Sequence, residues 1–158
     1  GAISGAHFNP SVSMVFWMKN EIKTIELLYY IISQIVSGLL AILVVHFIFD
    51  QPLFQISLNV RGKIPMLISE ILATSGLLMT ILFVRKNDPD SVAIAVALFI
   101  SAGYWFTSST SFANPAVTIA RIFTDTFTGI APISVKYFIS GQIIGCLLAN
   151  FIFNIFDD

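Results

Sequence analysis

The stretch SFANPAVT, residues 111–118, decides the fold of this chain, and a similar stretch, SGAHFNP, occupies residues 4–10. In both, small polar residues precede an Asn-Pro pair, and ordinary helix formers follow it. Asn is a favoured helix N-cap, and Pro at the first helical position loses no needed N–H and already has the helical φ. The pairs that begin at Asn9 and Asn114 therefore each predict the N-terminus of a helix.

The composition is that of a membrane protein. Of the 158 residues, 56% are hydrophobic and 11% are charged, against about 25% charged in soluble domains, and the mean hydropathy is +0.88. The net charge of −1 and the lack of a charge run exclude a nucleic-acid partner. The single Cys146 has no partner for an internal disulfide and lies in an apolar segment, which predicts plain packing. We therefore expect an integral membrane protein whose main partner is the lipid bilayer.

Apolar segments of two lengths alternate along the chain. A helix needs about 20 residues to cross a hydrocarbon core of roughly 30 Å. The segments predicted to span lie at residues 24–49, 64–84, 92–106 and 134–156. The apolar runs after the two Asn-Pro pairs, 11–18 and 114–123, reach only about half the needed length. The predicted fold is all-α and transmembrane, with four full spans and two half-helices.

An internal repeat links the two halves. Residues 34–41 match residues 142–149 at an offset of 108, with five of eight positions identical, and the two asparagines are 105 residues apart. Each unit thus has a half-helix, a loop and a full span, and the second unit has two further spans before its motif. By symmetry the first unit should have two as well.

We therefore expect one membrane channel domain over residues 1–158 that is truncated at its N-terminus. Residues 1–49 would be the rest of the first repeat, and residues 64–158 the second. Gly1 falls directly within the first motif with no initiator Met, which agrees with two missing spans.

Broken helices at corresponding positions of two repeats indicate a site at the midplane of a transport protein. Asn9 and Asn114 are predicted to meet head to head there, as donors at the pore centre. Two positive helix ends would repel a cation and orient a water file in opposite directions, which excludes protons. The predicted pore-lining loop residues are Gly5, Ala6 and His7 in the first stretch and Thr110, Ser111 and Phe112 in the second. A single Asn-Pro would favour a helix cap in a loop, because it is a common turn dipeptide, but the pair favours a pore.

The two motifs resemble the signatures of the major intrinsic protein family, the aquaporins and glycerol facilitators. The resemblance implies six tilted spans and two half-helices, a homotetramer with one pore per subunit, no cofactor or metal, and no enzymatic activity. It also implies that Glu70 matches the carboxylate of the fourth span, which supports a pore loop. Without the resemblance, Glu70 is a candidate ion-coupling group.

Two departures from the family pattern affect the expected filter. Ser11 replaces the usual Ala, and Val117 stands where most members have the filter arginine. By the same alignment Ser111, together with Ala102 or Gly103, falls on other filter positions. All of these side chains are small, so the constriction should be wider and less polar than in a strict water channel.

Arg121 lies four residues after Val117, on the same helix face and one turn further out. The side chain is predicted either to guard the outer mouth or to snorkel to lipid headgroups. The positive-inside rule does not decide the orientation, because the charges on the two sides are equal in number. The family resemblance places the Lys86 loop in the cytoplasm.

Residues 104–117 and 124–130 look like a bacterial branch of the family associated with arsenic resistance, which implies the bacterial inner membrane. Arsenite at neutral pH is an uncharged trihydroxide with hydrogen-bonding demands close to those of glycerol. The expected function is a passive channel for small neutral solutes: water, glycerol-like polyols and arsenite-type metalloid hydroxides. The alternatives are an ion-coupled carrier that uses Glu70 and a non-conducting structural protein of the same fold.

Overall fold

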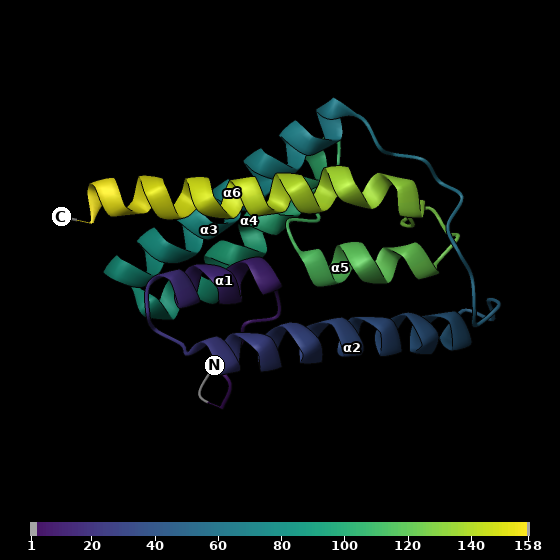
Figure 1. The fold of residues 1–158 in the computed structure, drawn as a ribbon, viewed down its shortest axis with the longest axis horizontal. Coiled ribbons are helices and arrows are strands. Elements are labelled where there is room, and N and C mark those ends of the chain that lie inside the picture. The colour runs from purple at the N-terminus through teal and green to yellow at the C-terminus, as the bar shows by residue number, and fades with distance from the viewer. Residues whose placement is uncertain (1–2, 158) are drawn as a thin grey trace.

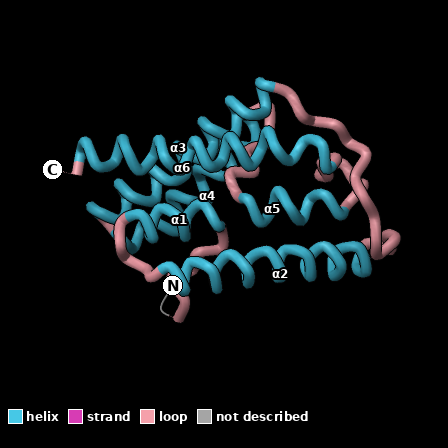
Figure 2. The backbone as a smooth tube through the Cα atoms, in the orientation of Figure 1, coloured by secondary structure: helices cyan, strands magenta, loops and turns pink. Residues whose placement is uncertain are grey.

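The computed structural model describes residues 3–157, which form helices joined by loops and no strand (Figure 1, Figure 2). Four helices are long and apolar enough to cross a membrane, α4 being counted together with the short turn before it. They are α2 (Thr24–Ile48), α3 (Ile64–Asn87), α4 (Val92–Phe106, after the 3-10 turn η1, Pro89–Ser91) and α6 (Val135–Phe156, after the 3-10 turn η3, Pro132–Ser134). The predicted four spans are confirmed.

Two short helices lie inside this frame. They are α1 (Pro10–Met18) and α5 (Pro115–Ala120), and the 3-10 turn η2 (Arg121–Phe123) continues α5. Figure 1 shows α1 and α5 end to end between α2 and α6, and each of them contacts both long helices. The predicted pair of half-helices is therefore confirmed.

The ends of two helices differ from the prediction. Helix α3 continues past Val84 to Asn87, with Arg85 and Lys86 in its last turn, where cations interact favourably with the helix dipole. Both Nη atoms of Arg85 also donate to the carboxylate of Glu21, at 3.0 and 2.6 Å. The second half-helix ends as a 3-10 turn, which satisfies terminal carbonyls by tightening the last turn.

Helices α3 and α6 form the central pair, and two glycines let them touch. A Cβ at Gly141 would lie 2.6 Å from the carbonyl oxygen of Leu67, and one at Gly145 would lie 2.8 Å from that of Ile71. Small residues four apart on one helix face permit this backbone approach in membrane proteins. The close contact fixes α6 against the span that carries Glu70.

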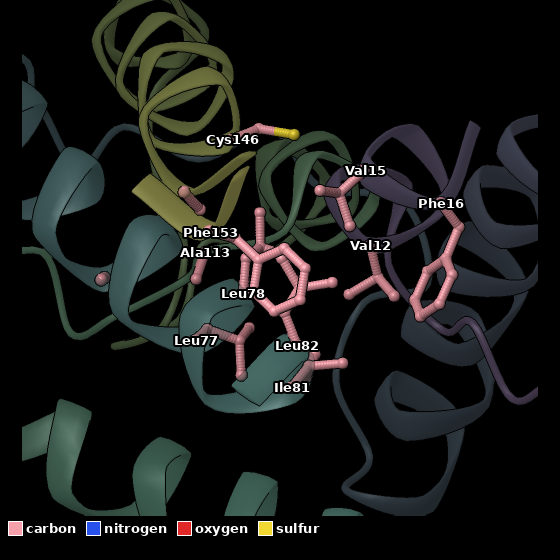
Figure 3. Packing of buried hydrophobic residues seen from close by; sticks show 12 residues of the cluster. Val12, Val15, Phe16, Leu77, Leu78, Ile81, Leu82, Ala113, Cys146 and Phe153 are labelled. Atoms are coloured by element: carbon pink, nitrogen blue, oxygen red, sulfur yellow. The ribbon is translucent and has the colours of Figure 1, made fainter. Parts of the chain in front are cut away.

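The hydrophobic core holds α1 against α3 and α6, as Figure 3 shows. Val15 of α1, Leu78 of α3 and Cys146 of α6 are fully buried in it. The predicted packing role of Cys146 agrees with its position, because its thiol contacts the carbonyl oxygen of Ser11 at 3.5 Å. The half-helix α1 is therefore held in place by side-chain packing along its length.

Helices α2 and α4 instead expose most of their apolar side chains. In the most apolar 18-residue stretch of each, only 6% of the residues are buried, against 44% in α3 and 39% in α6. Apolar faces of this extent occur where lipid or another helix covers them. The arrangement agrees with an integral membrane protein.

The loop between α2 and α3 lies across the loop that follows η2. The backbone N–H of Ala131 donates to the backbone carbonyl of Asn59 at 2.8 Å. The side-chain Nδ2 of Asn59 donates to the carbonyl of Gly129 at 3.1 Å. The buried His46 adds a further link, with Nε2 2.9 Å from Thr124 Oγ1 and Nδ1 3.0 Å from the carbonyl oxygen of Leu53. These contacts fix the two loops to each other at one end of the bundle.

Candidate functional site

The two Asn-Pro motifs meet and exchange hydrogen bonds. Asn9 Nδ2 donates to the carbonyl of Ala113 at 2.7 Å, and Asn114 Nδ2 donates to the carbonyl of Phe8 at 2.9 Å. Each amide therefore binds the residue that precedes the other asparagine. The N-termini of α1 and α5 face each other at this point, as the sequence predicts.

The oxygen of each asparagine caps its own helix. Asn9 Oδ1 accepts from the backbone N–H of Ser11 at 2.9 Å, and Asn114 Oδ1 accepts from those of Ala116 and Val117 at 3.0 and 3.3 Å. An amide nitrogen carries two hydrogens, and the exchanged bond uses one of them. The second N–H of each asparagine has no partner among the hydrogen bonds of the described residues.

The loops before the asparagines adopt a strained backbone. Left-handed φ angles occur at Gly5 (69°) and Ala6 (56°), and at Thr110 (62°) and Ser111 (49°), which are their counterparts at the repeat offset of 105. Only glycine adopts this region without cost, and such strain persists where the surrounding structure enforces it, commonly at functional sites. The unusual backbone turns peptide groups away from regular pairing along the cavity wall.

Two glutamines at matching positions of the repeat, which the sequence did not assign to the site, support the half-helices. Gln34 of α2 donates to the carbonyl of His7 and, at 3.1 Å, to Ser13 Oγ. Gln142 of α6 donates to Thr118 Oγ1 at 2.8 Å. Ser13 and Thr118 each lie four residues after their asparagine, so the two supports correspond. The identical Gln at the offset of 108 is the signal that could have found them.

Glu70 supports the second loop from α3. Its Oε1 accepts from the backbone N–H of Phe112 at 3.0 Å, and its Oε2 accepts from that of Ala113 at 2.8 Å and from Gln142 Nε2 at 2.6 Å. The residue is fully buried and is not among the residues that line the cavity. The geometry is that of a structural acceptor, which satisfies two backbone donors that the left-handed loop leaves without partners.

A cavity of about 1600 Å³ passes the meeting point of the two motifs. Its lining includes Arg61, just before α3, and Arg85, in the last turn of α3. The helical part of this interval, residues 64–85, is about 32 Å long at 1.5 Å per residue, which is close to the hydrocarbon thickness of a bilayer. The predicted site residues among its lining are Gly5, Ala6, His7, Asn9, Thr110, Ser111, Phe112, Asn114, Val117 and Arg121.

On α4, the structure differs from the predicted filter position. Ala102 is exposed and is not among the cavity-lining residues. Gly103, the alternative, is buried against Ser111, because a Cβ on it would lie 2.6 Å from Ser111 Oγ. Gly103, rather than Ala102, therefore contacts the second loop at Ser111, because the helix turns Ala102 outward.

His7 lines the cavity as an aromatic wall. Its ring stacks on Phe16 of α1 and Tyr30 of α2, with centroids 4.5 and 4.9 Å apart. The hydroxyl of Tyr30 donates to the carbonyl of Ser4. The first loop is thus fixed to both α1 and α2.

Arg121 bends back over the second loop. Its Nη1 donates to the carbonyl of Thr128 at 3.2 Å, and its Cζ lies 5.5 Å from the centroid of the Phe112 ring. It therefore lines the cavity rather than extending away from the bundle.

Comparisons with known proteins agree with this architecture. A family model described as "Major intrinsic protein" matches residues 1–90. The chain is 40% identical over 149 residues to the aquaglyceroporin AqpS of Rhizobium meliloti (strain 1021), covering 94% of this chain and 64% of that protein. It is 30% identical over 164 residues to a probable aquaporin NIP-type of Nicotiana alata, covering 98% and 58% respectively. A glycerol uptake facilitator protein of Buchnera aphidicola is 33% identical over 64 residues, which cover 39% of this chain and 24% of that protein.

Paired half-helices within a bundle of membrane spans define the fold of a membrane channel. The chain belongs to the major intrinsic protein family, so the predicted resemblance is confirmed. This is a family of channels and not of enzymes, which confirms the expectation that the chain is not an enzyme. The chain spans about two thirds or less of the length of these relatives.

Proposed function

We propose that the protein is a passive channel for small neutral solutes, namely water, glycerol-like polyols and arsenite-type metalloid hydroxides. The observation that carries the proposal is the pair of asparagines, Asn9 and Asn114, whose exchanged hydrogen bonds leave one N–H on each beside a cavity whose lining runs from Arg61, before α3, to Arg85, in its last turn. A solute that both donates and accepts hydrogen bonds finds donors at the asparagines and acceptors at the loop carbonyls. Cations are disfavoured there because two helix N-termini converge.

The filter supports permeation by solutes larger than water. Val117 and Ser111 line the cavity next to Phe112, and Val117 supplies neither charge nor donors where most family members have arginine. The similarity to a protein named as an aquaglyceroporin, at 40% identity, supports polyols as a substrate class. Metalloid trihydroxides belong to the proposal because they present a similar set of hydroxyl groups.

The ion-coupled carrier has weaker support. Both oxygens of Glu70 accept hydrogen bonds from the protein, and the residue does not line the cavity. A coupling carboxylate must exchange its ion with the transport path, which this position does not offer. No cofactor is needed for passive permeation.

We further propose that the protein acts as a homotetramer in a bacterial plasma membrane. The exposed apolar faces of α2 and α4 offer surfaces for lipid and for neighbouring helices. Each subunit would then carry its own pore, lined by its own two motifs. The bacterial relatives support the membrane assignment.

The function is tested by reconstituting the full-length protein in proteoliposomes and following volume changes by stopped-flow light scattering. We expect faster swelling in a glycerol gradient than in empty liposomes, and the same glycerol flux at acid and neutral pH. The variant Glu70→Gln tests the carrier alternative, because it keeps a hydrogen-bonding side chain and removes the charge. Uptake that is driven by a pH gradient and disappears in Glu70→Gln would support the carrier instead. No permeability in a correctly assembled tetramer would support a structural protein.

A further inference from the structure

Arg61 enters the cavity from the loop between α2 and α3 and binds the segment just before the filter residue Ser111. Its Nη2 donates to the carbonyl of Ser108 at 3.2 Å. Both Nη atoms also lie near Thr110 Oγ1, at 3.5 and 3.4 Å. Arg61 is itself among the residues that line the cavity.

The guanidinium group also reaches past Ser111. Its Cζ lies 5.7 Å from the centroid of the Phe112 ring. The Cζ of Arg121 lies 5.5 Å from the same centroid. Thr110 and Phe112 are the two neighbours of Ser111 in the chain. Arg61 therefore contacts the wall on both sides of the filter residue.

The backbone around Arg61 is held in position. Its N–H donates to Ser134 Oγ at 2.9 Å. The next residue is Gly62, where a Cβ would lie 2.9 Å from the ring of Tyr137 and 3.0 Å from the Cα of Ser134. The close approach that this glycine permits holds the loop against the start of α6 and directs Arg61 inward.

The group keeps its charge and has donors to spare. Burial lowers the pKa of Arg61, and the negative charge of Glu70 partly offsets that effect, but a guanidinium stays protonated in proteins. Its bonds to Ser108 and Thr110 use at most three of its five N–H groups. The ion pairs of residues 3–157 do not include Arg61. A charged group with free donors thus lines the mouth of the cavity.

We propose that Arg61 replaces the filter arginine that Val117 lacks and is a specificity-determining residue of the channel. Arg61 supplies a positive charge and hydrogen-bond donors beside those of Arg121, while Val117 keeps the constriction wide. Arg61 excludes cations at this mouth and donates to the hydroxyl groups of an entering solute. This inference rests on the proposed channel function.

The test compares permeation in proteoliposomes that contain the full-length protein. The variants are wild type, Arg61→Ala, Lys63→Ala and the double variant Arg61→Ala/Val117→Arg. Lys63 is the matched control, because it carries the same charge two residues away, is exposed and does not line the cavity. Methylammonium uptake, followed as the electric charge that it carries across the membrane so that neutral methylamine does not contribute, reports cation exclusion, and water and glycerol fluxes report the neutral path.

Arg61→Ala is expected to raise methylammonium uptake about tenfold, the lower end of what a focused charge changes in local ion concentration. Its water flux should stay within twofold of wild type, and Lys63→Ala should behave as wild type. The double variant should restore cation exclusion, because an arginine at residue 117 returns the positive charge from α5. Arg61→Ala/Val117→Met, which adds bulk at residue 117 without charge, should not restore exclusion, and this comparison separates the return of the charge from a narrower path.

Unchanged methylammonium uptake in Arg61→Ala, or a rise that the double variant does not reverse, would overturn the inference. If Arg61→Ala does not assemble, Arg61→Gln removes the charge, keeps hydrogen-bond donors and is interpreted in the same way. A wild-type protein that passes neither water nor glycerol would instead refute the channel function itself.

Discussion

Val117 occupies the first turn of α5, and its backbone N–H is one of the two that the cap oxygen of Asn114 accepts. Val117 lines the same cavity as Ser111, the other residue predicted for the filter. If Val117 belongs to the filter as proposed, the width of the pore at this level should be sensitive to this single side chain. A long cationic residue here would enter the space that the proposed solutes must cross.

We expect Val117→Arg to reduce glycerol flux about tenfold, equivalent to about 1.4 kcal/mol of barrier, and to reduce water flux less. The arginine narrows the path, and a small molecule passes a narrow constriction more easily than a polyol. Stopped-flow measurements of both fluxes on the same vesicles provide the check. Val117→Met controls for bulk without charge. An equal loss of water and glycerol flux in Val117→Arg would contradict the assignment of residue 117 to the filter.

Residue roles that depend on neighbours in the chain could be predicted from the sequence, and roles that depend on contacts with distant residues could not. Asn9 and Asn114 could be identified because helix capping depends on neighbours in the chain. The inward path of Arg61 depends on contacts with Ser134 and Thr110, which lie 73 and 49 residues away. The side-chain direction of Ala102 depends on how α4 is rotated, and a uniformly apolar helix leaves that rotation undetermined.

Among the elements, α3 and α6 make the tightest contact of the bundle. The carbonyls of α3 lie where side chains at Gly141 and Gly145 would otherwise be. The glycine of α2, Gly38, has more room, because a Cβ there would meet only the Cβ of Ala120 at 3.4 Å and the carbonyl oxygen of Ala116 at 3.6 Å. The same substitution at the two sites should therefore differ in effect.

Gly145→Ala is expected to destabilise the protein by about 1–3 kcal/mol, the usual cost of overpacking a filled site. Gly38→Ala should be neutral or stabilising by up to about 1 kcal/mol, because alanine favours a helix over glycine. The thermal unfolding midpoints of the two variants in detergent, measured beside wild type, test this difference. Similar midpoints for both variants would show that the α3–α6 contact relaxes easily.

The existence of each α-helix, and its approximate length except at the C-terminal ends of α3 and α5, could be predicted from the sequence. Apolar length separates the full spans from α1 and α5, and the Asn-Pro pairs mark where the half-helices begin. The change from α-helix to a 3-10 turn at Arg121 has no comparable signal, because terminal turns tighten in response to their surroundings. The same limit applies to the loop between α2 and α3, whose course depends on tertiary hydrogen bonds.

For the molecule as a whole, α3 links the two ends of the cavity. Lys63 precedes this helix and Asp90 follows it, and both are exposed. Because the helix is long and apolar enough to cross a bilayer, the two residues should lie on opposite sides of the membrane. Charge counting cannot tell which side is which, since the two sides carry equal numbers of basic residues.

Lys63→Cys and Asp90→Cys should react with a membrane-impermeant thiol reagent from opposite sides, with Asp90→Cys labelled from the cytoplasm. Cys146 is the built-in control, because it is fully buried and should remain unlabelled in wild-type protein. Labelling of intact cells and of inverted vesicles, followed by mass measurement, distinguishes the two sides. Reaction of both variants from one side would contradict a spanning α3.

The exchanged bonds between the two motifs have a consequence for transport kinetics. Neither half-helix can withdraw from the midplane unless the bonds from Asn9 to Ala113 and from Asn114 to Phe8 both break. If the proposed channel function holds, we expect the aperture to stay fixed and open to both compartments at once, with no step that closes one side before the other opens. Solute flow should rise in proportion to the concentration difference without saturating, and solute preloaded on the far side should not accelerate entry.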